Sequence, residues 1–375
     1  TVAAHREPMA GSTARDEALL GYRTVLREPR LRTLVGVLAC SKVVEGAVDT
    51  LVVLVALELL GLAACTAKDE PAVVVYTSVD QPFAEPILTA FEQKTGVRVL
   101  AVYDTEAAKT TGLVSRLSAE RDHPQADVFW SSEIAQTLWL QDHGLLAVYQ
   151  SPVADDIPAG FRDPQGYWTG LGYRTRVIIV NTERVAPEDY PQTLADLLDP
   201  KWGPGEVGLA NPLFGTTATH AAALYASWGA QPALDYFQQL EAQGVRIVDG
   251  NSVVRDMVAS GDLKLGLTDT DDADAAVQAG KPVIVIFPDQ DGAGTLAIPN
   301  TVALVAGGPN LAQGQALIDY LLSAEVETQL IRDGFLHGSL RDSASAGPVL
   351  MAVDWRAVAE QMEAAKRDLQ DLFLR

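Results

Sequence analysis

The stretch AVVVYTSVDQPFAEPILTAFEQKTG, residues 72–96, carries the pattern that decides the fold. AVVVYTS is rich in β-branched residues and predicts a buried strand, and the amphipathic segment after it predicts a helix that ends at Gly96. The pattern recurs, because VRVLAVYD and ADVFWSS are predicted strands and each precedes a helical stretch. Strands that alternate with helices indicate βαβ units and a parallel sheet with right-handed crossovers.

The three predicted strands each run into a polar or acidic loop. Ligands of a parallel sheet bind beyond the carboxyl ends of its strands, so these loops are the first candidates for a binding site. The candidate ligand-binding residues on this side are Thr77, Ser78, Asp80, Glu106 and Glu133.

A second set of strands and helices begins after RTRVIIVNTERV, an apolar run from Arg174 that we interpret as a crossover. EVGLANP, VRIVDGNS and LKLGLTD are its predicted strands, and TLAIPNTVALVAGG is expected to return to the first set. The chain would then cross twice between two lobes, as in a hinged clamp. We therefore predict a two-lobed α/β fold in which each lobe is a mainly parallel sheet flanked by helices, with the ligand cleft between the lobes. The first lobe is expected to comprise residues 72–176 and 290–375, and the second residues 177–289.

The composition argues against several classes of function. The formal net charge is -21, whereas recognition of nucleic acid needs clustered Lys and Arg, so we expect no nucleic-acid partner. The two cysteines, Cys40 and Cys65, precede the predicted lobes, and the histidines lack the spacing of zinc ligands. No GxSxG elbow or P-loop occurs, and we expect no enzymatic activity and no catalytic cofactor.

Residues 1–65 differ in character from the rest of the chain. TLVVLVALELLGLAA has the length of a signal-peptide core, and the LAAC that ends at Cys65 matches a bacterial lipobox. This predicts a lipoprotein in the periplasm or at the cell surface, anchored to a membrane through Cys65. Charged residues such as Lys42 and Glu58 leave a second interpretation open, in which the segment is a fused transmembrane helix of a transporter.

FGTTATH, residues 214–220, is a candidate anion site on the second lobe. Glycine and hydroxyl residues open a predicted helix here, and the exposed amides and dipole of a helix start favour an anion. Gly215, Thr216 and Thr217 are therefore candidate ligands. The alternative is plain N-capping by one of the threonines, which stabilises a helix by about 1 kcal/mol.

GLTDTDDADAA, residues 266–276, is a candidate cation site. Aspartate in the first turn stabilises a helix by itself, which accounts for part of the cluster. Asp269 directly ends a strand. With Asp271, and with Glu106, Glu133 or Asp80 from the facing lobe, it could form the all-oxygen cage that hard cations such as Fe(III), Ca(II) or Mg(II) prefer. An amine-bearing ligand would be served equally well. Arg174 and Arg176, near the crossover, could neutralise a carboxylate or phosphate ligand, but we prefer the interpretation that they are ordinary surface arginines.

Several segments resemble a known family in their order along the chain. YTSVDQPFAEPILTAFEQKTGVRV, PQADVFWSSE, GLANP with FGTTATHAAAL, GDLKLGLTDTDDA and IPNTVALVAGGPN follow one another within residues 72–345. The set resembles the extracytoplasmic solute-binding proteins of ABC importers, specifically the ferric-iron-binding-like cluster. The resemblance implies a type II periplasmic-binding fold, capture of a ligand by closure of two lobes, and delivery to a membrane permease and its ATPase.

The resemblance also implies site residues. A pair of iron-binding tyrosines in that family corresponds to Asp271 and Asp272 here, and an acidic first-lobe ligand corresponds to Glu106. The family's synergistic anion would lie on residues 215–217, with Asn251 as a further contact. The implied metal ligands are Glu106, Asp269, Asp271 and Asp272.

These observations predict the substrate-binding component of an ABC transporter, monomeric, that binds iron or another metal ion together with a synergistic anion. One alternative is a binding protein for a small organic or phosphorus-containing anion. The other alternative, from a different class, is a membrane transporter fusion.

Overall fold

The structure is a computed structural model, and it describes residues 71–104, 110–341 and 347–373. The strands are β1 (Ala72–Thr77), β2 (Arg98–Tyr103), β3 (Val128–Ser131), β4 (Leu146–Ala147), β5 (Thr169–Asn181), β6 (Val207–Ala210), β7 (Arg246–Val248), β8 (Leu265–Asp269), β9 (Val283–Ile286) and β10 (Ala297–Val305). The α-helices are α3 (Gln81–Thr95), α4 (Thr111–Ala119), α5 (Ala135–Asp142), α6 (Gly215–Trp228), α7 (Ala230–Ala242), α8 (Asn251–Ser260), α9 (Thr270–Gln278), α10 (Leu311–Leu321), α11 (Ala324–Arg332) and α12 (Trp355–Phe373).

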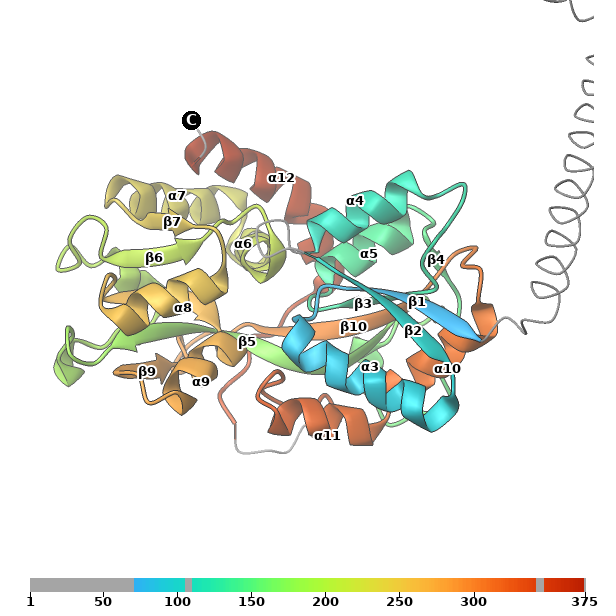
Figure 1. The fold of residues 1–375 in the computed structure, drawn as a ribbon. Helices are drawn as coiled ribbons and strands as arrows, with labels where there is room; N and C mark the ends of the chain where they lie inside the picture. The colour runs from blue at the N-terminus through green and yellow to red at the C-terminus, as the bar shows by residue number, and fades with distance from the viewer. Residues whose placement is uncertain (1–70, 105–109, 342–346, 374–375) are drawn as a thin grey trace, which may run out of the picture. The chain divides into compact units, whose positions relative to one another are not determined.

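The strands are arranged in two groups that share β5 (Figure 1). In the first, called the β1 group, β1 pairs in parallel with β2 and β3, and β10 runs antiparallel between β3 and the first half of β5. In the second, called the β6 group, β6 pairs in parallel with β7 and β8, and the second half of β5 pairs with β8 and β9. The pairing of β5 passes from β10 to β8 between Thr175 and Arg176. The prediction of a two-lobed α/β fold is confirmed, in a sheet that mixes parallel pairs with the antiparallel pairs of β5 and β10. The residue boundaries of the lobes stay a prediction.

Alternating side chains give each group of strands two apolar faces. On β3, Val128 and Trp130 face a core formed with α3, α10 and α11, whereas Phe129 between them faces a core formed with α4 and α5. Successive side chains of a strand point to opposite faces, so a short run of apolar residues supplies both cores. The helices therefore lie on both sides of the strands, as Figure 1 shows.

The first predicted helix begins and ends as its sequence indicates. Pro82 lies in the first turn of α3, where its missing N–H costs nothing, and Gly96 adopts a left-handed conformation with φ of 71° at the end. The Gly96 amide donates to the carbonyl oxygen of Glu92 at 2.8 Å. This ending turns the chain directly into β2.

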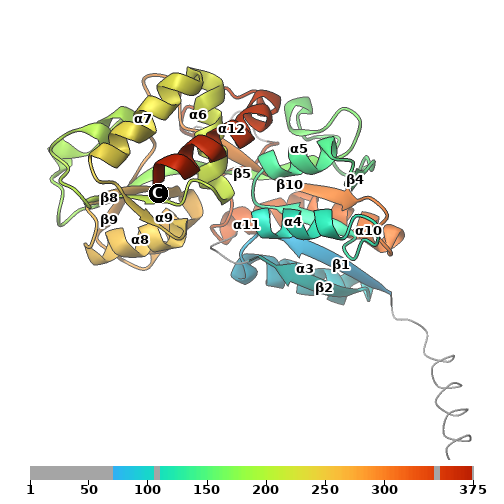
Figure 2. The same ribbon diagram turned by 90° about the horizontal axis from the view of Figure 1, so that it is seen from above.

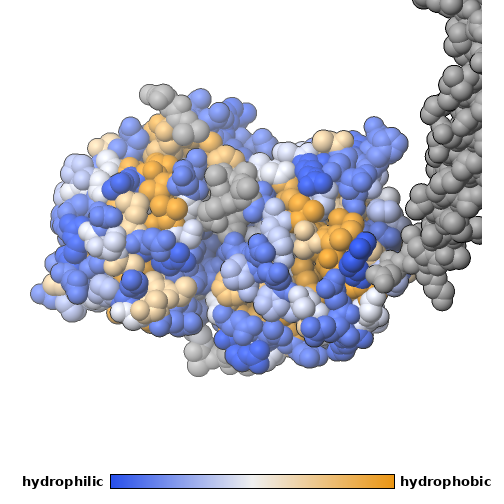
Figure 3. Space-filling view, viewed as in Figure 1, coloured by the Kyte–Doolittle hydropathy of each residue, from blue (hydrophilic) through white to orange (hydrophobic). Residues whose placement is uncertain are grey.

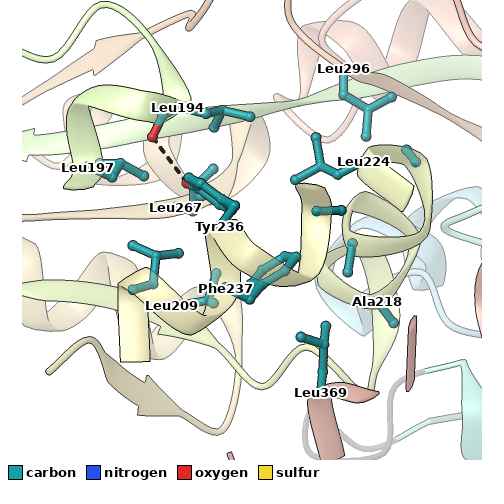
Figure 4. Packing of buried hydrophobic residues seen from close by; sticks show 14 of the residues in the cluster. Leu194, Leu197, Leu209, Ala218, Leu224, Tyr236, Phe237, Leu267, Leu296 and Leu369 are labelled. Carbon is teal, nitrogen blue, oxygen red and sulfur yellow. Dashed lines mark hydrogen bonds between the residues drawn. The ribbon is translucent and has the colours of Figure 1, made fainter. Parts of the chain in front are cut away.

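The C-terminal helix α12 packs mainly against the helices of the β6 group. Val358, Met362, Ala365 and Leu369 of α12 share a core with α6 and α7 (Figure 4, which labels Leu369 beside Ala218 and Phe237). Figure 2 shows α12 lying alongside α6 and α7, with its N-terminal end toward α5. At that end, Arg356 Nη1 lies 2.8 Å from Asp142 Oδ1 of α5. The helix therefore contacts elements that flank both groups of strands.

Polar residues cover most of the molecular face drawn in Figure 3, with apolar residues gathered in a patch on each half. This distribution accords with the large negative net charge of the chain. Within the ranges that the structure describes, no helix is both long and apolar enough to cross a membrane. Cys65 and the predicted signal or transmembrane segment lie outside the described residues.

Candidate functional site

A pocket lies where β6 and β8 end and α6 and α8 begin. Most of its lining comes from the β6 group. Two residues come from elsewhere, because Ser132 follows β3 and Arg174 lies on β5. Besides those two, the lining includes Asn211, Phe214, Asp249 and Gly250. The pocket is thus closed on one side by the β1 group and sits at the carboxyl ends of parallel strands, where this class of sheet binds ligands.

Two helix N-termini meet at this pocket. Phe214 and Gly250 precede α6 and α8, and neither supplies a side-chain cap. Gly215 has φ of 54°, a left-handed conformation that favours glycine and lets the backbone turn into α6 at the pocket wall. The first amides of a helix have no partners within the helix, and the helix dipole is positive at this end. Two such ends at one pocket favour an anionic ligand.

Four buried charged residues form a cluster at the pocket, and two of them, Arg174 and Asp269, line it. Arg174 and Arg176 lie two residues apart on β5, so their side chains share a face of the strand, and they are 2% and 1% exposed. Arg176 Nη1 lies 2.6 Å from Asp269 Oδ1. Arg174 Nη1 lies 2.8 Å from Asp271 Oδ2 and 3.3 Å from Asp269 Oδ2. The formal charges of these four groups cancel, and each buried charge has an opposite partner, as burial requires.

Asp269 is held by donors from three elements. Its Oδ2 accepts from Thr216 Oγ1 of α6 at 2.6 Å and from Asn251 Nδ2 of α8 at 3.0 Å, in addition to the contacts with the arginines. Burial alone would raise the pKa of Asp269, but Arg176 and Arg174 outweigh that effect and lower it. The carboxylate therefore stays ionised and ties the starts of both helices to β5 and β8.

Arg174 connects the two groups of strands. Its Nη2 donates to the carbonyl oxygen of Ser132 at 3.0 Å, and its guanidinium lies over the Phe335 ring, 5.1 Å from the centroid. Burial alone would lower the pKa of Arg174, but Asp271, Asp269 and Asp80 together raise it. Its Nε has no hydrogen-bond partner among the described residues. The pocket is therefore lined by a permanently charged guanidinium whose terminal nitrogens contact Asp271, Asp269 and the Ser132 carbonyl.

His220 lies one turn beyond the threonines of α6, against the same charges. Burial is the main reason that its pKa falls to about 3, with Arg176 lowering it further and Asp269 opposing. The ring is neutral at physiological pH and adds no charge to the site.

All of the predicted second-lobe residues except Asp271 come together at the pocket. Gly215, Thr216, Thr217, Asn251 and Asp269 all line it. The two threonine hydroxyls are engaged by neighbouring polar side chains of Asp269 and Asn251, and neither caps its own helix. Whether these residues contact a ligand stays a prediction.

None of the predicted first-lobe residues that the structure describes lines the pocket. Ser78 Oγ accepts from the Ser132 amide at 2.9 Å and so holds the loop that carries Ser132, whereas Thr77 Oγ1 accepts from the Val79 amide at 3.1 Å within the loop after β1. Glu133 is fully buried, and Asp80 precedes α3. Glu106 lies outside the described residues. The role of these five residues as ligand contacts stays a prediction.

The predicted metal ligands are each engaged by an arginine where the structure describes them. Asp269 and Asp271 pair with Arg174 or Arg176, and Asp272 Oδ1 lies 3.0 Å from Arg255 Nη1. Among the described residues, no group of three or more His, Cys, Asp or Glu side chains is placed to hold a metal ion. Because Glu106 is not described, a cage that includes it stays a prediction.

The interpretation of Arg174 and Arg176 as surface residues was wrong, because both are almost fully buried. A signal for this was present in the sequence. RTRVIIVN places two arginines at alternate positions of an apolar strand, and LKLGLTDTD ends another apolar strand in alternate aspartates. Two buried strands that carry opposite charges at the same spacing can pair, and β5 and β8 do so with Arg176 opposite Asp269.

The model of the bacterial extracellular solute-binding proteins matches residues 124–361. This chain belongs to that family. The solute-binding protein is 26% identical over 280 residues to the iron uptake protein A1 of Synechocystis, a match that covers 72% of this chain and 76% of the relative. It is also 26% identical over 288 residues to a putative 2-aminoethylphosphonate-binding periplasmic protein of Salmonella typhimurium, covering 73% of this chain and 80% of the relative.

Among solved structures, the ferric binding protein from Campylobacter jejuni superposes with a TM-score of 0.72 at 20% identity, covering 80% of this chain and 99% of that one. This likeness supports the same two-lobed architecture. The predicted family and fold class are both confirmed.

Proposed function

We propose that this solute-binding protein is the substrate-binding component of an ABC importer and that its pocket binds the oxyanion group of a small solute. The observation that carries the proposal is the meeting of two helix N-termini with the buried guanidinium of Arg174 at one pocket. The two helix starts favour a negative group, and Arg174 supplies guanidinium donors at the same pocket although its charge is balanced by Asp269 and Asp271.

The roles of the residues follow from their positions. The amides at the start of α6, from Gly215 to Thr217, and those near Asn251 at the start of α8 would donate to the oxyanion. Arg174 lines the pocket and would add a charge-assisted hydrogen bond through its guanidinium. Asp269 would hold both helices in place, because it already accepts from Thr216 and Asn251.

A phosphorus oxyanion is the class of solute that fits best. It presents several acceptor oxygens at once, which matches amides converging from two helices. One relative of this chain is named for binding 2-aminoethylphosphonate, which supports the same class.

Ferric iron with an accompanying anion is the second candidate. The observation in its favour is the likeness to a relative named as an iron uptake protein. In that case Glu106, Asp269, Asp271 and Asp272 would supply carboxylate oxygens, which hard cations prefer. The cost is that the described carboxylates would have to exchange arginine partners for the metal.

The remaining features of the proposal concern the cellular setting. The protein would act without catalysis, as a monomer outside the cytoplasmic membrane, and would deliver its solute to a permease and ATPase in that membrane. The LAAC sequence supports anchoring through a lipid on Cys65. Lipid labelling of the wild-type protein, with a Cys65→Ser variant as control, tests this part separately.

A thermal-shift panel on the purified protein distinguishes the two solutes. We expect inorganic phosphate or 2-aminoethylphosphonate to raise the melting temperature in a concentration-dependent way, because a ligand that binds the folded state stabilises it by mass action. Ferric iron alone, measured on protein first treated with a chelator, should have little effect. A shift with ferric iron and none with either phosphorus compound would overturn the proposal in favour of the second candidate.

A further inference from the structure

The carboxylate of Glu133 joins the β1 group to the β6 group behind the pocket. It follows β3, is 0% exposed, and accepts from the amides of Ala135 and Gln136 at 2.7 and 3.0 Å, so it caps the start of α5. It also accepts from Thr219 Oγ1 of α6 at 2.7 Å. One carboxylate thus engages the first turn of one helix and the second turn of another.

Both ends of this connection adjoin the pocket lining. Thr219 lies two residues beyond Thr217, and Ser132 immediately precedes Glu133. The Ser132 carbonyl in turn accepts from Arg174. The pocket walls formed by α6 and by the loop after β3 are therefore tied directly to each other, as well as through β5.

A buried carboxylate at position 133 is less favourable than a neutral side chain would be, and capping of α5 does not by itself require one. Serine or threonine can cap a helix, whereas a fully buried carboxylate loses its hydration. Burial raises the pKa of Glu133, and the hydrogen bonds from Thr219, Gln136 and Ala135 and the nearby Lys366 of α12 only partly offset it. A longer side chain with two acceptor oxygens reaches α6 while it caps α5, and a serine or threonine has too short a side chain for both contacts.

We propose that Glu133 is a positioning residue, which fixes the anion-binding end of α6 against the loop after β3 so that the two walls of the pocket keep one geometry. Glu133 does not line the pocket, so it would act on ligand affinity only through the placement of Thr216, Thr217 and Ser132. The part of this inference that concerns ligand affinity rests on the function proposed above, whereas the coupling between α5 and α6 does not.

The test removes the hydroxyl of Thr219 while keeping the size of its side chain. Thr219→Val deletes the donor, and Thr219→Ser restores it. Thr328→Val is a matched control, because the Thr328 hydroxyl bonds only within its own helix, to the Ala324 carbonyl at 2.7 Å on the exposed side of α11. Two readouts are needed, namely amide hydrogen exchange at the starts of α5 and α6 in the ligand-free protein, and calorimetric titration with inorganic phosphate.

We expect Thr219→Val to speed exchange at the amides of Ala135 and Gln136 and at the start of α6. We also expect it to weaken phosphate binding, by about tenfold at most, because the loss of one hydrogen bond to a charged group limits how far the position of α6 can affect affinity. Thr219→Ser should restore both, and Thr328→Val should change neither. Unchanged exchange in both Thr219→Val and Glu133→Gln would overturn the coupling. If the wild-type protein fails to bind phosphate, the proposed function is wrong for that ligand, and the exchange measurement still decides the coupling.

Discussion

The site holds its buried charges in two different ways, and the comparison explains its design. At the base of the pocket, Asp269 and Asp271 are neutralised directly by Arg174 and Arg176. Behind the pocket, Glu133 is held by two amides and a hydroxyl, with Lys366 nearby. The pKa of Asp269 is accordingly lowered, whereas that of Glu133 is raised.

In the first arrangement opposite charges neutralise each other, whereas in the second hydrogen bonds fix the position of a carboxylate. Each charge of a buried ion pair stays ionised because its partner is present. Removal of one partner destabilises the protein, because the other charge is then buried without compensation. Hydrogen bonds from helix amides orient a carboxylate but do not cancel its charge. The paired cluster therefore sets the electrostatic character of the pocket, and Glu133 sets the relative position of its walls.

Breaking the paired cluster is expected to have the largest effect. Asp269→Ala would leave Arg176 without its nearest carboxylate and would free Thr216 and Asn251, so we expect a loss of about 3–5 kcal/mol in the free energy of unfolding. Urea denaturation followed by circular dichroism measures this. A loss below about 1 kcal/mol would mean that the arginines find other partners and that the cluster is not a closed unit.

An effect of intermediate size is expected from pH, because the buried, neutral His220 lies beside the cluster of paired charges. The pKa of His220 is about 3 in the folded protein and about 6.5 when unfolded, so its contribution to stability is present above pH 6.5 and is lost as pH falls toward 3. At pH 5 the loss should be about 2 kcal/mol. His220→Gln should reduce the dependence of unfolding free energy on pH between 7 and 5 by that amount, and an unchanged dependence would show that the imidazole is protonated in place.

The smallest effect is expected at the outlying pair of Asp272 and Arg255, whose side chains are 14% and 25% exposed. Asp272→Asn should lower the free energy of unfolding by less than about 1 kcal/mol, because water screens a partly exposed ion pair. The same denaturation experiment measures it beside Asp269→Ala. Equal losses in the two variants would erase the distinction between the buried cluster and its periphery.

Much of the architecture could be predicted from local pattern. The alternation of apolar strands with amphipathic helices predicted the fold, and FGTTATH predicted the start of α6 and its place at the pocket. These predictions succeed because each depends on neighbours in the sequence. Asp269 was also expected at the site, since it ends a strand whose carboxyl end faces the cleft.

The features that local pattern did not predict depend on pairing between strands that lie far apart in the chain. Arg174 and Arg176 seemed ordinary because their partners, Asp271 and Asp269, lie more than 90 residues away in the chain. The acidic run 269–274 therefore suggested a cation site, although arginines of β5 neutralise two of its aspartates. The link from Glu133 to Thr219 spans a similar distance in sequence and has no local signal.

The most direct measurement of the central claim is calorimetric titration with inorganic phosphate of the wild-type protein and of Arg174→Met, with Arg255→Met as the control. Arg174 lines the pocket, whereas Arg255 pairs with Asp272 outside its lining. We predict that wild type and Arg255→Met bind phosphate equally, and that Arg174→Met binds at least about tenfold more weakly, since a charge-assisted hydrogen bond is lost. Equal affinity in all three proteins, or no phosphate binding by the wild-type protein while ferric iron binds, would contradict the account.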